Sequence, residues 1–132
     1  MPDSMYYHLV QLISRDIAFV DDIINLNKTD YIAQIAFNTQ QILEKVLKLI
    51  LYSCAIPEKR VRSAGHSLVT LVTLVENQGV KVPDYIRVLI SKVSSWESAT
   101  RYDDCFADSL NVNTVLNAYF MVKKYALLVI NG

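Results

Sequence analysis

The sequence predicts an all-α fold, an up-and-down antiparallel bundle of about five helices, in a single domain that spans residues 1–132. Apolar residues recur with helical spacing in five stretches, and short polar segments separate them. Three glycines and three prolines in 132 residues are fewer than the turns of a β-sandwich or barrel need. The hydrophobic content of 52% is enough to build one core without a metal or a disulfide.

The stretch from Ile35 to Cys54 is the most apolar part of the chain and is expected to be the central helix. Its apolar residues cover an arc of roughly 200° on a helical wheel, which is wider than a surface helix needs. The remaining narrow strip carries the polar residues Asn38, Gln41, Glu44, Lys45 and Lys48. On a mostly buried helix, such a strip is either a solvated seam or the floor of a binding site.

Four further helices are expected, at about residues 4–25, 66–77, 83–98 and 112–130. Helix 66–77 contains many β-branched residues that also suit a strand, but its i, i+3, i+4, i+7 spacing favours a helix. Residues 57–65 form the longest linker signal. Asp16 lies inside the apolar arc of the first helix, so it is either paired or placed at an edge where it reaches water.

The composition excludes several classes of protein. Thirteen basic and thirteen acidic residues give a net charge of zero, which argues against a strongly basic nucleic-acid scaffold but leaves a local patch open. No signal peptide pattern and no run of 18 uncharged apolar residues occurs, so we expect a cytoplasmic protein without a membrane span. Cys54 and Cys105 form no metal or redox motif, and we expect no metal and no cofactor.

The linker concentrates positive charge beside one of the two histidines. Lys59, Arg60 and Arg62 lie within four residues, and His66 follows at the expected start of a helix. A histidine near a helix N-terminus tends to stay neutral and can then act as a general base. The alternative interpretations are a solvated basic loop and a capping or surface histidine.

A second set of candidate ligand-binding residues comes from two other parts of the chain. Arg101 and Tyr102 could clamp and stack on an anionic aromatic ligand such as a nucleotide. Lys45 and Lys48, on the polar strip of the central helix, could receive its phosphate. The alternatives are that Arg101 pairs with an aspartate, that Tyr102 packs on the bundle end, and that both lysines only solvate the helix.

Several stretches occur in an order that resembles a known family. These stretches are RDIAFVDDI, then AFNTQQILEKVLKLIL, GHSLVTLV after a loop, VPDYI at the start of the next helix, and TRYD after that helix. Together, over about residues 9–129, they are similar to the HEPN domain family (higher-eukaryote and prokaryote nucleotide-binding domain). FNTQQILEKVLK followed by GHSL at this distance is the most specific part.

The resemblance implies an all-α bundle of four to five helices that is often dimeric and is associated with nucleotide or RNA binding. Many members are encoded beside a small nucleotidyltransferase partner in toxin–antitoxin or defence settings. The catalytic branch contains metal-independent ribonucleases with an Arg-x4–6-His motif. Arg60 and His66 match that spacing, with five residues between them. However, the motif of that branch lies on a late helix, and no histidine follows Arg101 in this chain.

The sequence therefore leads to one main hypothesis and two alternatives. The main one is a non-enzymatic HEPN module that binds a nucleotide or other anionic ligand through Lys45, Lys48, His66, Arg101 and Tyr102. It would act as a homodimer or beside a partner such as a small nucleotidyltransferase. The alternatives are a toxin-type, metal-independent ribonuclease with Arg60 and His66 as catalytic residues, and a purely structural interaction or dimerisation domain.

Overall fold

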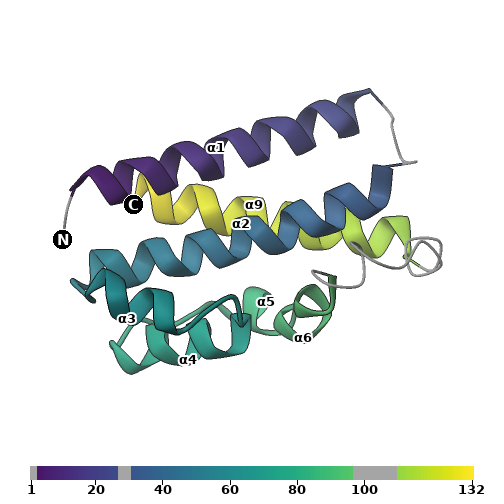
Figure 1. Cartoon of the computed structure of the whole chain (residues 1–132). Coiled ribbons are helices and arrows are strands. Elements are labelled where there is room, and N and C mark those ends of the chain that lie inside the picture. The colour runs from purple at the N-terminus through teal and green to yellow at the C-terminus, as the bar shows by residue number, and fades with distance from the viewer. Residues whose placement is uncertain (1–2, 27–30, 97–109) are drawn as a thin grey trace.

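Three long helices form the frame of the molecule. The computed structural model describes residues 3–26, 31–96 and 110–132, and within these residues the chain forms helices and no strand. Helices α1 (Asp3–Asn25), α2 (Ile32–Ser53) and α9 (Val112–Asn131) pack side by side (Figure 1). α1 runs antiparallel to α2 and to α9, which are parallel to each other, so the start of α1 and the end of α9 lie at the same end of the bundle (Figure 1). The all-α bundle predicted from the sequence is confirmed.

α2 is the central helix, because it packs against α1, α9 and the short helices of the other side. Most of its residues are buried. They are Ile32, Ile35, Ala36, Thr39, Gln40, Ile42, Leu43, Glu44, Val46, Leu47, Leu49, Ile50, Leu51 and Tyr52. Thr39 satisfies its buried hydroxyl by donating to the Ile35 carbonyl at 2.7 Å. Apolar as α2 is, none of the helices in the described residues combines the length and hydropathy needed to cross a membrane.

Four short helices cover the side of α2 that faces away from α1 (Figure 1). They are α3 (Glu58–Ser63), α4 (Leu68–Asn77), α5 (Asp84–Arg87) and α6 (Ile90–Ser94). Each contributes at least one buried apolar side chain to the same core as the long helices. The described part of the connection between α2 and α9, residues 54–96, is therefore a layer of short helices, which gives seven helices in the described part of the chain where the sequence predicts about five.

The structure corrects the sequence prediction at two places in this layer. The expected linker 57–65 contains α3, whose first turn forms as the amides of Arg60 and Val61 donate to the Pro57 carbonyl at 3.0 and 3.1 Å. Val61 is buried and ties this short helix to the core. The helix expected at 83–98 is broken into α5 and α6, because the Leu89 amide bonds the Ile86 carbonyl, three residues back, at 2.9 Å.

A polar contact between α1 and α9 fixes how these two helices pack. The Tyr119 hydroxyl lies 2.7 Å from Asp21 Oδ1 and 3.2 Å from the Ile17 carbonyl oxygen. Lys123 Nζ lies 2.7 Å from Asp21 Oδ2. Burial, together with the hydrogen bond to Asp21, raises the pKa of Tyr119 above its ordinary value, so the phenol stays protonated and donates. These contacts set the register of α9 on α1.

Candidate functional site

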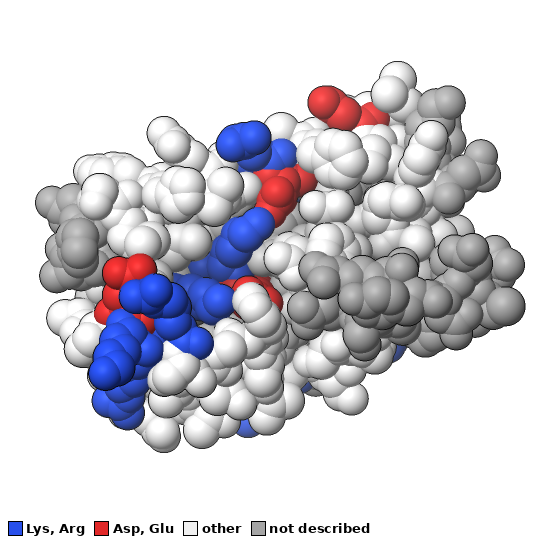
Figure 2. Space-filling view, viewed as in Figure 1, with Lys and Arg blue, Asp and Glu red and all other residues white. Residues whose placement is uncertain are grey.

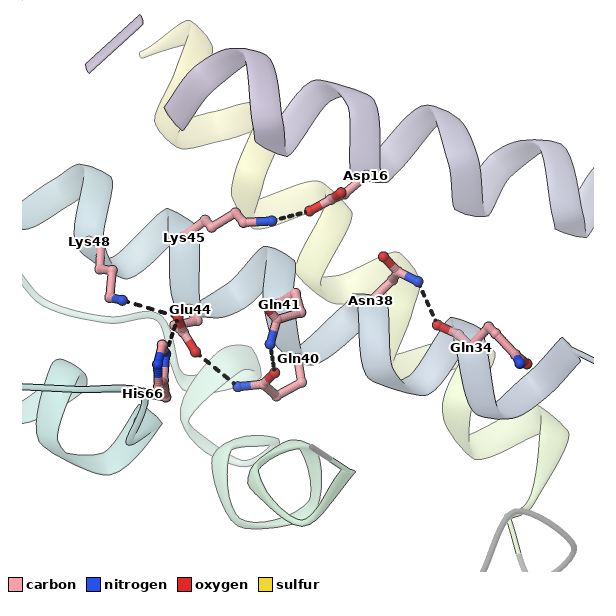
Figure 3. Close-up of polar contacts among 9 residues, drawn as sticks. All are labelled: Asp16, Gln34, Asn38, Gln40, Gln41, Glu44, Lys45, Lys48 and His66. Atoms are coloured by element: carbon pink, nitrogen blue, oxygen red, sulfur yellow. Dashed lines mark hydrogen bonds and ion pairs between the residues drawn. The ribbon is translucent and has the colours of Figure 1, made fainter. Parts of the chain in front are cut away.

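A cluster of polar side chains on α2 centres on the buried carboxylate of Glu44 (Figure 3). Only 5% of the Glu44 side chain is exposed. Lys48 Nζ lies 3.1 Å and His66 Nδ1 lies 2.9 Å from Glu44 Oε2. Gln40 Nε2 donates to the other oxygen, Oε1, at 3.3 Å. Glu44 therefore connects the central helix to the turn that precedes α4.

The contacts of Glu44 compensate the negative charge of its buried carboxylate. An unpaired charge in a protein interior costs several kcal/mol, whereas Glu44 has one cation, Lys48, and hydrogen-bond donors on both oxygens. Gln41 Nε2 donates to Gln40 Oε1 at 2.6 Å, which fixes the Gln40 amide so that its nitrogen faces Glu44. The partners of Glu44 are thus held in place by further hydrogen bonds.

His66 reaches Glu44 from the turn between α3 and α4. Gly65 adopts a left-handed conformation with φ +69°. Glycine has no Cβ, so this backbone conformation causes no steric strain. The Gly65 amide donates to the Arg62 carbonyl at 3.0 Å, which closes the end of α3. The sequence places His66 at the start of a helix, but α4 begins at Leu68, and Ser67 is its N-cap, accepting from the Thr70 amide at 3.2 Å.

Replacing Gly65 with alanine is expected to destabilise the fold by about 1 kcal/mol, because a side chain is disfavoured in the left-handed region. Gly79, with φ +83° and open space around it, is the matched control and is expected to cost a similar amount as Gly79→Ala. Only Gly65→Ala should also move the imidazole signals of His66 in NMR spectra. Equal imidazole spectra in both variants would show that Gly65 does not position His66.

Lys45 lies on the same strip of α2 as Lys48 but points to a different helix (Figure 3). Its Nζ lies 2.5 Å from Asp16 Oδ2 on α1, and both side chains are only about a fifth exposed. The sequence left open whether Asp16 is paired or reaches water. In the structure its carboxylate is paired with Lys45 and also keeps some contact with water. Both lysines of the strip thus have a carboxylate partner within the chain, which a phosphate would have to displace or share.

Much of the uncompensated positive charge of this face lies on α3. Lys and Arg side chains form a band that runs from α3 across α2 to α1 (Figure 2). On α3, Lys59, Arg60 and Arg62 are all exposed. Arg62 Nε lies 3.8 Å from Glu58 Oε1, whereas Lys59 and Arg60 have no ion-pair partner among the described residues. An anion approaching this face would meet free cations on α3 first.

The remaining candidates and the two grooves described on the surface lie elsewhere. Arg101 and Tyr102 fall outside the described residues, so their convergence with His66 stays a prediction. One groove, of about 600 Å³, runs along α9 and is lined by Phe120, Lys123, Lys124, Leu127, Leu128, Asn131 and Gly132. The other, of about 230 Å³, lies between α4 and α6 and is lined by Val69, Val72, Thr73, Glu76, Arg87 and Ile90.

Comparison with known protein families identifies the chain. The family model described as HEPN domain matches residues 10–126, which covers most of α1, the Glu44 cluster, the α3 cations and most of α9. The chain belongs to the HEPN domain family. No curated protein and no solved structure matches it significantly.

Glu44 is the centre of the polar cluster in this HEPN domain. The sequence indicated it only as one member of the polar strip of the central helix. A signal was present, since Leu51, seven residues later, lies within about 20° of Glu44 on the helix and belongs to the apolar arc. Within the described residues, no group of three or more His, Cys, Asp or Glu side chains could hold a metal ion.

Proposed function

We propose that this HEPN domain is a non-enzymatic module that binds the phosphate of a nucleotide or of RNA on the face formed by α3 and His66. The family has nucleotide- and RNA-related roles, which makes a phosphate the anion to consider first. The single observation that carries the proposal is the set of exposed, uncompensated cations on α3 directly before the turn that presents His66.

The chemistry of these side chains suits a phosphate. Arg60 and Arg62 offer guanidinium groups, whose planar donors match two phosphate oxygens at once. His66 adds an imidazole edge, because its side chain is 68% exposed although Nδ1 contacts Glu44. Lys45 and Lys48 contribute to the positive potential of the face, but their ammonium groups are held by Asp16 and Glu44. The predicted contributions of Arg101 and Tyr102 would add to this site.

The substitution Arg60→Glu is expected to weaken binding of ATP or of a short single-stranded RNA by about tenfold or more, since it removes a charge-assisted contact and adds repulsion. Isothermal titration calorimetry at low salt measures the affinity. Lys92→Glu, on exposed α6, changes the net charge equally and is expected to leave the affinity within about twofold. Absence of binding in the unaltered protein, or equal losses in both variants, would contradict the proposal.

One observation favours the metal-independent ribonuclease as a second candidate. His66 is held at Nδ1 by a buried carboxylate and has an exposed ring edge, which is the way a general base is oriented in hydrolytic enzymes. His66 would take the proton of a ribose 2′-hydroxyl, whose oxygen then attacks the adjacent phosphorus. That attack forms a cyclic phosphate and breaks the bond to the 5′-oxygen of the next nucleotide, which takes a proton from water and leaves as a hydroxyl, while Arg60 holds the phosphate.

RNA cleavage in EDTA separates this candidate from the binding module. The ribonuclease requires cleavage by the unaltered protein and its loss in His66→Ala and Arg60→Ala. His8→Ala is the control, since His8 is the other histidine of the chain and is exposed on α1. Equal cleavage in the unaltered protein and His66→Ala, or none in either, would leave the non-enzymatic module.

We also propose that the module forms a homodimer through α9. Phe120, Met121, Leu127 and Leu128 are exposed there, although large apolar side chains normally avoid water in such a group. Phe120 and Leu128 lie about 12 Å apart along the helix axis, so a two-fold axis near Lys124 would set Phe120 of one protomer against Leu128 of its partner. The Lys124 ammonium lies 4.8 Å from the Tyr85 ring centroid of its own chain. This contact holds the positive charge of Lys124 to one side of the proposed apolar contact.

The substitution Leu128→Glu is expected to convert a dimer to a monomer, because it places two carboxylates in an apolar contact. Light scattering during size-exclusion chromatography measures the mass. Leu26→Glu changes another exposed leucine, just after the last residue of α1, and is expected to leave the dimer intact. A monomeric unaltered protein would contradict the homodimer. A small nucleotidyltransferase encoded by an adjacent gene, as in toxin–antitoxin pairs, would then be the partner to test.

A further inference from the structure

We propose that the buried Glu44 carboxylate fixes the proton of His66 on Nδ1, so that Nε2 faces the ligand and takes up a proton when a phosphate binds. Glu44 is then a positioning residue, and His66 Nε2 is the atom that contacts the phosphate. This inference rests on the proposed phosphate-binding function and names the atom and the proton that the function uses.

The tautomer follows from the hydrogen-bonding roles of the two groups. A carboxylate oxygen accepts hydrogen bonds and donates none, and Glu44 Oε2 lies 2.9 Å from His66 Nδ1. Lys48 Nζ, a pure donor, contacts the same oxygen at 3.1 Å, and Gln40 Nε2 contacts Oε1 at 3.3 Å. Three nitrogen atoms therefore surround one carboxylate, which can only accept, and Nδ1 carries the hydrogen. In the neutral ring the proton-free nitrogen is Nε2.

The two nitrogens of the ring face different surroundings. Glu44 is almost fully buried, with 5% of its side chain exposed, whereas the His66 side chain is 68% exposed. The edge of the imidazole that does not contact Glu44 is therefore open to solvent. A neutral Nε2 presents a lone pair and carries no hydrogen, so it cannot donate a hydrogen bond to a phosphate oxygen. Once protonated, the ring lies between two anions, Glu44 and the ligand phosphate, and donates to both.

The charges around His66 come from two helices. On α2 these are Glu44 and Lys48, and the Lys48 ammonium contacts the same oxygen, Oε2, as the ring. On α3 they are Glu58, Lys59, Arg60 and Arg62, which together carry a net positive charge. The first turn of α4 has no acidic residue. A phosphate bound at this face would be a second anion beside the ring, opposite Glu44.

The proposal predicts that phosphate binding and proton uptake are linked. An ordinary imidazole changes its protonation between about pH 8 and about pH 6. A ligand that needs the protonated ring should therefore bind about tenfold more tightly at the lower pH. The probe is a dinucleoside phosphodiester without a terminal phosphate, because its single phosphate group keeps the same charge over this range. Calorimetry at the two pH values in His66→Gln is expected to show no such increase.

NMR of the imidazole nitrogens tests the geometry without any ligand. The chain contains two histidines, so His8→Gln assigns the signals, and exposed His8 serves as the internal reference. At about pH 8, we expect His66 to carry its proton on Nδ1 and to lose this preference in Glu44→Gln. If Glu44→Gln does not fold, the nitrogen spectrum of the unaltered protein still shows which ring nitrogen carries the proton, and its pH profile of binding still tests the proton uptake.

The outcomes separate this inference from the function on which it rests. A His66 proton on Nε2, or the same pH dependence of binding in His66→Gln, would overturn the inference and leave the phosphate-binding module standing. No binding of the phosphodiester, of ATP or of RNA at either pH would overturn both. An Nδ1 proton in the free protein, together with tighter binding at low pH that depends on His66, is the result expected.

Discussion

Replacing Leu47 with alanine is expected to lower the free energy of unfolding by about 3 kcal/mol, the largest single effect expected for this chain. Leu47 is completely buried in the middle of α2, the helix that contacts both layers of the bundle. The substitution loses the transfer free energy of the side chain and leaves a cavity that the neighbouring helices can only partly close. Urea unfolding followed by circular dichroism measures the change.

Leu26→Ala is the matched control, because it is the same chemical change at a leucine that is 68% exposed. It is expected to alter the free energy of unfolding by less than about 0.5 kcal/mol. Similar losses in the two variants would mean that α2 is not the centre of the core.

The second large effect is expected at the buried ion pair. Glu44→Leu should cost about 2 kcal/mol, because it leaves the Lys48 ammonium, only 18% exposed, without its carboxylate. Lys48→Met should cost a similar amount, because it leaves the buried carboxylate without its cation. The double variant removes both charges together. Its loss of unfolding free energy should be smaller than the sum of the two single losses by about 1–2 kcal/mol.

The Glu58 and Arg62 pair on α3 is a control for this double-mutant cycle in the same chain. It has the same i,i+4 spacing, but its 3.8 Å contact is solvent-exposed, with 40% and 72% of the two side chains accessible. Its coupling energy is expected to stay below about 0.5 kcal/mol. A Glu44–Lys48 coupling no larger than that of the exposed pair would show that burial adds nothing to the interaction.

Much of the fold could be predicted from apolar periodicity, because that pattern is a property of single helices. The wide apolar arc of residues 35–54 predicts a helix contacted on several sides, and α2 is buried in this way. The short helices were harder to predict. α3 has six residues and is stable only because Val61 packs into the core, and the break between α5 and α6 depends on one backbone hydrogen bond.

The candidate site could be predicted only in part. Basic residues before His66, and two lysines on the polar strip of the central helix, were visible in the sequence and led to a phosphate site. The partners of these groups were not visible, because Lys45 and Asp16 are 29 residues apart and Glu44 and His66 are 22 apart. Arg101 and Tyr102 lie outside the described residues, so their part in the site is still a prediction.

By itself, the sequence determined that this chain is a helical bundle of the HEPN family with α2 at its centre, because periodicity, composition and the order of its motifs are local properties. Only the tertiary structure decided which charges meet. Glu44 and Lys45 are neighbours in the chain, but one side chain is buried against the turn before α4, and the other reaches Asp16 on α1. Adjacent residues on a helix point about 100° apart, so the packing of other helices decides each partner.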